Sequence, residues 1–287
     1  MANINEILTT IFKKESQVIA PLLGGMMNRS FIVESDNKKY VLYIATPEAN
    51  KMVNRLLEKD NQSVVYQLGI TSKNIYFDTT KGIKANEYIE GSSLDKCDSF
   101  DYQKVVRLLK TLHSSKQLSK EDYQPFKRFI SYEEEALSFI KEFSLEYQLL
   151  RKAVFANQDF LESQPLVLSH NDAQKSNIIK DNNDNYFLID FEFMGNNDEI
   201  YDIATFGNNS VQEGFHLLEV YFNHDLKREE IIRYYLWRIF ISLQWHNVAI
   251  KKHFQGEGKT HGYNFLNVAN YFLRSAKEAY HKWKEVR

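Results

Sequence analysis

Two short polar segments, separated by a strand–turn–strand pattern, constrain this chain more than any other feature. The first is S-H-N-D-A-Q-K-S-N at 169–177, and the second is L-I-D-F-E at 188–192. Between them, short apolar runs at 178–179 and 186–189 flank a turn rich in Asn and Asp at 181–185. Apolar runs on either side of such a turn predict a β-hairpin. Its strands begin or end in polar residues, Asn177 and Asp190, that are able to bind a metal ion.

The same residues meet the chemical requirements of phosphoryl transfer from ATP. A carboxylate must orient the attacking hydroxyl, and an amide oxygen and a second carboxylate must hold Mg²⁺ on the phosphates. Kinase catalytic loops supply the first two groups as H-x-D-x-x-x-x-N, and the third from an Asp one hairpin later. Asp172 and Asn177 have this spacing, and Asp190 opens the later segment. We therefore predict Asp172 as the base and Asn177 and Asp190 as Mg²⁺ ligands, and we call 169–177 the catalytic loop.

Composition excludes several other classes of protein. The chain has 287 residues, enough for two lobes or one large domain, and 43% of them are hydrophobic. A net charge of −2 argues against nucleic acid as a partner. The single cysteine, Cys97, excludes internal disulfides and suits a reducing cytoplasm. No secretory signal and no apolar run of membrane-spanning length are present, so we expect a cytoplasmic protein, either monomer or dimer.

The first hundred residues predict a nucleotide-binding sheet. Residues 4–18 have the apolar spacing of a helix, and strands are expected at 31–34 and 40–44. The glycine turn at 24–25 would let backbone amides approach the phosphates of a nucleotide. We therefore predict Gly25, Asn28 and Ser30 as ATP contacts.

The third strand of such a sheet should carry a cation that pairs with the phosphates and with a glutamate on the next helix. The helix predicted at 48–68 offers Glu58 for this role, but position 43 of the strand is a tyrosine. Arg55 and Lys51, near the start of the helix, are the alternatives for the missing cation.

A hinge is expected after the hairpin formed by 75–77 and 83–89. Main-chain groups of Glu87 and Ile89 are the candidates for contact with adenine. We predict an α+β, two-lobed protein-kinase-like fold, with a small antiparallel-sheet lobe at 1–90 and a larger, mainly helical lobe at 91–287. In the second lobe, a capping box predicts a helix from Ser131. Asp202, near the start of a later helix, is expected to support the catalytic loop.

These residues resemble a known family. The segment H-N-D-A-Q-K-S-N, together with L-I-D-F-E-F at 188–193 and Y-D-I-A at 201–204, is similar to the choline/ethanolamine kinases of the aminoglycoside-phosphotransferase-like group. The segments G-G-M-M-N at 24–28, N-R-L-L-E-K at 54–59, E-Y-I-E-G at 87–91 and L-K-T-L-H at 109–113 look like the bacterial LicA-type choline kinases. The likeness extends in order over nearly the whole chain.

The resemblance implies a substrate site as well as a catalytic one. It makes Asp172 the base and Asn177 and Asp190 the Mg²⁺ ligands, with Glu192 beside the metal and Gln174 close to the substrate hydroxyl. Kinases of this type hold a trimethylammonium group within aromatic rings. Phe193, Trp245 and Tyr263 stand at the positions of such rings. Val248 stands where the family has a second tryptophan, and Tyr43 stands where it usually has Arg or Lys.

The expected function is ATP- and Mg²⁺-dependent phosphorylation of a small amino alcohol, most simply choline to phosphocholine. Ethanolamine, thiamine or an aminoglycoside are alternative acceptors for the same fold. An alternative of a different class is a ligand-binding pseudokinase, which the tyrosine at position 43 would suit.

Overall fold

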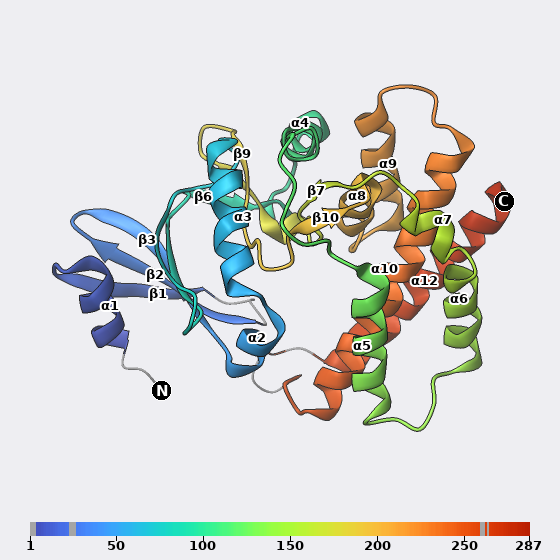
Figure 1. Cartoon of the computed structure of the whole chain (residues 1–287), viewed down its shortest axis with the longest axis horizontal. Helices are drawn as coiled ribbons and strands as arrows, with labels where there is room; N and C mark the ends of the chain where they lie inside the picture. The colour runs from blue at the N-terminus through green and yellow to red at the C-terminus, as the bar shows by residue number, and fades with distance from the viewer. Residues whose placement is uncertain (1–3, 23–26, 259–261, 263) are drawn as a thin grey trace. The chain divides into compact units, whose positions relative to one another are not determined.

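The computed structural model describes residues 4–22, 27–258, 262 and 264–287. The chain folds as two compact units, which can be followed in Figure 1 by their colours along the sequence. The N-terminal unit comprises residues 1–99 and 176–194, and the C-terminal unit comprises 100–175 and 195–287. The division therefore differs from the single boundary after residue 90 that the sequence predicts. In the described part of the chain, no helix has the length and apolar character needed to cross a membrane.

An antiparallel sheet with the strand order β1-β2-β3-β5-β4 forms most of the N-terminal unit. Its strands are β1 (Ser16–Leu22), β2 (Asn28–Ser35), β3 (Lys38–Ala45), β4 (Asn74–Asp78) and β5 (Ile83–Glu87). Helix α1 (Ile4–Phe12) packs on the face that carries Leu42 and Ile83. Because side chains alternate along a strand, the next residues, Tyr43 and Lys84, face the opposite side of the sheet.

Two helices of this unit differ from the sequence prediction. The helix predicted at 4–18 ends at Phe12, because Lys13 has a left-handed backbone (φ 52°), and β1 begins at Ser16. The helix predicted at 48–68 is divided into α2 (Pro47–Met52) and α3 (Arg55–Gln67). Asn54 caps α3, since its side-chain oxygen accepts from the Leu57 amide at 3.2 Å. Arg55 is therefore the first residue of α3, one turn before Glu58.

A second, smaller sheet explains why the hairpin belongs to the N-terminal unit. It consists of β6 (Gly91–Ser93), β8 (Ile178–Asp181) and β9 (Tyr186–Leu188), in the order β6-β8-β9. β8 and β9 form the predicted hairpin, in which Ile178 pairs with Leu188. Gly91 lets β6 approach closely, since a Cβ there would lie 2.2 Å from the Lys180 carbonyl oxygen.

The C-terminal unit is mainly helical, which together with the sheets of the other unit confirms the predicted α+β class. Its elements are α4 (Tyr102–His113), α5 (Pro125–Leu137), α6 (Leu145–Phe155), α7 (Gln158–Glu162), β7 (Val167–Ser169), β10 (Gly195–Asn197), α8 (Glu199–Phe206), α9 (Val211–Phe222), α10 (Arg228–Phe254) and α12 (Phe265–Val286). Helices α10 and α12 run alongside each other (Figure 1). The helix predicted to start at Ser131 starts earlier, at Pro125, where a missing N–H has no cost.

Buried aromatic side chains form the centre of this unit. The ring of Tyr201 on α8 lies 5.0 Å from that of Trp237 on α10, and Phe126 on α5 lies 4.9 Å from Phe240. All four side chains are at most 2% exposed. These contacts fix α5, α8 and α10 together, and α8 in turn holds the catalytic loop.

Candidate active site

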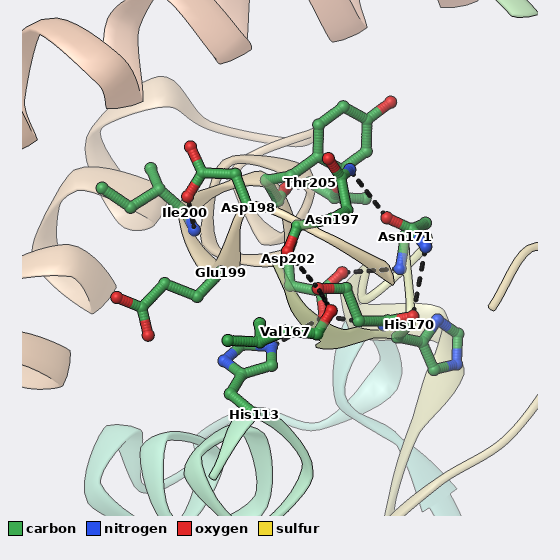
Figure 2. A network of polar contacts seen from close by, with 12 residues as sticks. His113, Val167, His170, Asn171, Asn197, Asp198, Glu199, Ile200, Asp202 and Thr205 are labelled. Carbon is green, nitrogen blue, oxygen red and sulfur yellow. Dashed lines mark hydrogen bonds and ion pairs between the residues drawn. The ribbon is translucent and has the colours of Figure 1, made fainter. Parts of the chain in front are cut away.

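The backbone of the catalytic loop is held by the carboxylate of Asp202 on α8. The His170 amide donates to Asp202 Oδ2 at 2.8 Å, and the Asn171 amide donates to Oδ1 at 2.6 Å (Figure 2). Both amides are buried with the carboxylate, so water does not compete for these bonds. The expectation that Asp202 supports this loop agrees with the contacts.

A second set of contacts fixes the conformation of Asn171. Its side-chain oxygen accepts from Asn197 Nδ2 at 2.8 Å, and its own Nδ2 donates to the carbonyl of Ser169 at 3.1 Å (Figure 2). The backbone of Asn171 is left-handed, with φ 64°, which costs about 1 kcal/mol or more for a residue other than glycine. These bonds hold Asn171 in that conformation and thereby direct the next residue, Asp172.

Asp172 itself is partly exposed and lies among residues of its own loop. The side-chain amide of Gln174 donates to Asp172 Oδ2 at 3.2 Å. The backbone amide of Asp172 donates to His170 Nδ1 at 3.2 Å, so the His170 ring supports the loop as a hydrogen-bond acceptor. Gln174, predicted to lie near the substrate hydroxyl, is therefore in contact with the predicted base.

In the N-terminal unit, the β8–β9 hairpin brings Asn177 and Asp190 to its open end. The Ile189 amide donates to the Asn177 carbonyl at 3.0 Å, so the two predicted metal ligands lie at the ends of neighbouring strands, Asn177 directly before β8 and Asp190 two residues after β9. Asp190 has a left-handed backbone, with φ 67°. Its Oδ1 is buried and makes no hydrogen bond, although Lys84 Nζ lies 3.9 Å away. An oxygen of this kind is suited to bind a cation.

Lys84 supplies the cation that β3 lacks. It lies on β5 directly opposite Tyr43, and its Nζ is 4.8 Å from the centre of the Tyr43 ring. The same ammonium is 2.5 Å from Glu58 Oε1, and both side chains are almost fully buried. Burial lowers the pKa of Lys84, but the carboxylates of Glu58, Asp190 and Glu192 outweigh it and leave that pKa above its ordinary value. Lys84 is therefore charged at neutral pH.

Arg55, one of the two alternatives predicted for this cation, also reaches Glu58. Its Nη1 is 2.6 Å from Glu58 Oε2 and 3.4 Å from Glu192 Oε2. Burial raises the pKa of Glu58, but Lys84 and Arg55 outweigh it and lower that pKa below its ordinary value. Lys51, the other alternative, is exposed on α2. Glu58 thus has two cationic partners, neither of which comes from β3.

Glu192 is buried beside this ion-pair group. Asn28 Nδ2 donates to its Oε2 at 3.2 Å, so Asn28, predicted as an ATP contact, is joined to the D-F-E segment. Burial, and then the charge of Asp190, raise the pKa of Glu192 to about 8 against the effect of Lys84 and Arg55. This carboxyl is able to hold a proton at neutral pH in the absence of a metal ion.

The remaining predicted contacts lie in several places. Ser30 is on β2, paired with Tyr43. Glu87 ends β5, and its amide already donates to the Lys73 carbonyl at 2.9 Å, so a contact with adenine would use its own carbonyl. Ile89 and Phe193 are half-buried. Gly25 and Tyr263 lie outside the described residues.

Trp245 on α10 stacks on a ring that the sequence prediction missed. Phe272 of α12 lies 5.9 Å from it, with 17° between the ring planes. Both side chains are half-buried, so each keeps part of its surface exposed. Lys84 was also missed, although the sequence has a signal for it, because this lysine stands between the apolar residues Ile83 and Ala85 of a predicted strand. Nothing in the sequence indicates that Phe272 pairs with Trp245.

Comparison with known proteins finds related sequences and structures. The family model for choline/ethanolamine kinase matches residues 19–241. A LicA protein of Haemophilus influenzae is 28% identical over 218 residues, which are 71% of this chain and 63% of that protein, so the chain matches less than two thirds of its length. The crystal structure of choline kinase LicA from Streptococcus pneumoniae has a TM-score of 0.76 at 24% identity and covers 98% of both chains.

A second solved structure, of LicA in complex with AMP, has a TM-score of 0.74 at 25% identity and covers 96% of this chain and 97% of its own. The likeness to these structures confirms the predicted kinase-like fold. The family model covers well over half of the sequence and includes both the catalytic loop and the D-F-E segment. The chain belongs to the choline/ethanolamine kinase family.

Proposed function

We propose that this protein is an ATP- and Mg²⁺-dependent kinase that phosphorylates the hydroxyl of choline. The observation that carries the proposal is the buried ion pair of Lys84 and Glu58, with Lys84 also 3.9 Å from Asp190. Kinases use a Lys–Glu pair beside a metal-binding Asp to hold the phosphates of ATP. The AMP complex of a LicA structure similar to this chain is further support for a nucleotide site.

The ligands at the open end of the β8–β9 hairpin fit Mg²⁺. Asp190 has a buried oxygen without a hydrogen-bond partner, and Asn177, directly before β8, offers an amide oxygen. Among the residues that the structure describes, no cluster of three or more His, Cys, Asp or Glu forms a metal site. Mg²⁺ does not need one, because it retains water and binds one or two carboxylates together with substrate phosphates. Asn177 and Asp190 would hold the ion, which when bound offsets charge on the transferring phosphoryl group.

The chain's own residues have distinct tasks in this proposal. Asp172 orients the acceptor hydroxyl and takes its proton, while the bond from Gln174 keeps the carboxylate in one orientation. Lys84 binds phosphate oxygens, and Glu58 keeps its ammonium in place. Tyr43, whose pKa burial raises to about 12, stays neutral next to Lys84 and adds no charge of its own.

Stacked aromatic rings support choline as the acceptor. A quaternary ammonium has no N–H to donate, so it is held by the faces of aromatic rings, with about 2 kcal/mol or more for a desolvated contact. Trp245 and Phe272 present such rings in the unit that contains Asp172. Ethanolamine, which the family also includes, would need acceptors for its N–H groups. A reducing cytoplasm, where ATP is available, is the compartment that we propose.

The alternative of a ligand-binding pseudokinase rested on the tyrosine at position 43. Lys84 weakens it, because the cation reaches Glu58 from the neighbouring strand. The kinase reading is therefore favoured over the pseudokinase.

Phosphate transfer from Mg-ATP to choline, ethanolamine, thiamine and kanamycin by the purified chain tests the proposal. We expect choline to have the highest kcat/KM, and Asp172→Asn to lower kcat by about a thousandfold through loss of the base. Trp245→Leu should raise KM for choline about tenfold and leave KM for Mg-ATP within about twofold. Binding of Mg-ATP without transfer to any acceptor would instead favour the pseudokinase. A preference for ethanolamine would support kinase activity but contradict choline binding by the aromatic rings.

A further inference from the structure

A series of buried hydrogen bonds continues from Asp202 away from the catalytic loop. His113 Nε2 on α4 is 2.9 Å from Asp202 Oδ2, and His113 Nδ1 is 2.9 Å from the hydroxyl of Tyr221 on α9. The Tyr221 hydroxyl is in turn 2.8 Å from Glu199 Oε2. Figure 2 shows the His113 ring pointing from α4 toward Asp202, with Glu199 close by. All of these residues belong to the C-terminal unit.

Burial makes the bonds of this series hard to replace with water. The side chains of His113 and Asp202 are 2% and 0% exposed, and Tyr221 is 4% exposed. Removing one partner would therefore leave a buried polar atom without a hydrogen bond. Lys110, also on α4, covers the outer face of Tyr221, with its Nζ 5.1 Å from the ring centre.

The number of hydrogens that these bonds need limits which groups of the series are protonated. The bonds Asp202–His113, His113–Tyr221 and Tyr221–Glu199 need three hydrogens. A neutral imidazole and a tyrosine hydroxyl supply one each. Both oxygens of Asp202 accept from backbone amides, as those of a carboxylate do, and a carboxylate supplies none. The third hydrogen is therefore on His113 Nδ1 or on Glu199.

An imidazolium at His113 accounts for the third hydrogen. In that form a positive ring contacts the fully buried carboxylate of Asp202, and this attraction works against the cost of burying the charge of the ring. Glu199 is half-buried, so its carboxylate keeps contact with water. His113 then donates from both ring nitrogens, from Nε2 to Asp202 and from Nδ1 to the Tyr221 hydroxyl. The Tyr221 hydroxyl in turn donates to Glu199. Burial and then the charge of Glu199 raise the pKa of Tyr221, so its hydroxyl retains its hydrogen.

We propose that Tyr221 and Glu199 are positioning residues for the reaction, which they serve by holding His113 as an imidazolium against Asp202. An imidazolium with both N–H groups bonded has a fixed ring orientation, and it fixes Asp202 in turn. Asp202 then keeps the amides of His170 and Asn171 in place, immediately before Asp172. The proposal rests on the proposed function in that Asp172 is taken as the base.

Tyr221→Phe tests the proposal, because it keeps the ring and removes only the hydroxyl. Tyr234→Phe is the matched control: its hydroxyl is also buried and donates to the Val211 carbonyl at 2.5 Å, outside the series. Both variants should unfold at lower urea concentration than the wild type. Only Tyr221→Phe should lower kcat, by about tenfold, with KM for choline and Mg-ATP within about twofold. Equal kcat values in the two variants would overturn the proposal.

Glu199→Gln provides a second variant at a half-exposed site, where folding is not at risk. A glutamine oxygen still accepts from Tyr221, so we expect a smaller fall in kcat, about threefold. Nitrogen NMR of the His113 ring, assigned with His113→Gln, supplies a readout that does not need turnover. The wild type should show hydrogens on both ring nitrogens, and Tyr221→Phe should lose the one on Nδ1. A wild-type ring with one bare nitrogen would exclude the imidazolium whether or not choline is phosphorylated.

Discussion

Lys84 stands directly opposite Tyr43 in the pairing of β3 with β5, so the two side chains share one face of the sheet. One cation is needed on this face beside Glu58 and Asp190, and its side chain can come from β3 or from β5. Arg55, at the first position of α3, adds a second positive charge that reaches Glu58 and Glu192. The charge of the site is thus distributed over a strand and a helix end.

This geometry makes a rescue experiment possible. Lys84→Met should lower kcat/KM for Mg-ATP by about a hundredfold, because the phosphates lose their cation and Glu58 loses one of its partners. Tyr43→Lys combined with Lys84→Met moves the ammonium across the pairing to the facing strand, and we expect it to restore about tenfold of that loss. Lys84→Arg, which keeps a positive charge at position 84, is the control. If the double variant were no better than Lys84→Met, the exchange of the cation between strands would be refuted.

Helix α9 contacts the catalytic loop as well as the His113 series. Lys175, between Asp172 and Asn177 in the sequence, has its Nζ 2.8 Å from Glu213 Oε2 on α9 and 5.8 Å from the centre of the Phe100 ring. Lys175 is mostly buried, with 12% of its side chain exposed, while Glu213 is about a third exposed at 35%. The hydroxyl of Ser210 caps α9 by accepting from the Glu213 amide at 3.2 Å. The loop is therefore attached to the first turn of a capped helix.

A double-mutant cycle measures what this attachment contributes. Lys175→Met and Glu213→Gln should each lower kcat about threefold to tenfold, since either change frees the loop next to Asp172, the proposed base. The double variant, Lys175→Met with Glu213→Gln, should lower kcat by less than the product of the two single effects, with a coupling energy of about 1 kcal/mol. Strictly additive effects in the cycle would show that the two residues act independently.

Local patterns in the sequence predict those parts of the site that lie close together along the chain. The spacing of Asp172 and Asn177 and the following hairpin predict the position of Asp190, and the structure has that hairpin. The contact of Gln174 with Asp172 is likewise a matter of two residues in one loop. Such features depend on backbone geometry over a few residues, which residue type and spacing largely determine.

The parts that the sequence does not predict depend on pairings between distant segments. Lys84 serves the site because β5 lies between β3 and β4, and strand order is not encoded in any one strand. Phe272 meets Trp245 only because α12 packs along α10. The helix predicted at 4–18 was too long because the backbone turns left-handed at Lys13, an angle that the residue types around it do not indicate. These features are determined by the pairing of distant helices and strands and by single backbone angles.

The stability of the whole protein should depend on pH through Glu192. Burial and the neighbouring Asp190 raise its pKa to about 8 in the folded protein, while an unfolded glutamate has a pKa of about 4.3. Between these values the folded protein binds a proton that the unfolded chain does not. The free energy of unfolding is therefore highest at the acidic end of this window and falls as pH rises toward 8, by at most about 1.4 kcal/mol per pH unit.

Urea unfolding without Mg²⁺, at pH values of about 5.5, 7 and 8.5, measures this dependence. Glu192→Gln should flatten the decline, because the variant has no proton to lose at that position, and Glu142→Gln, at an exposed carboxylate, should leave it unchanged. Added Mg²⁺ should also reduce the decline in the wild type, since a cation bound at Asp190 offsets the charge that keeps Glu192 protonated. Equal slopes for the wild type and Glu192→Gln would mean that another group carries the pH dependence. If added Mg²⁺ left the slope unchanged, protonation of Glu192 would not be coupled to metal binding at Asp190.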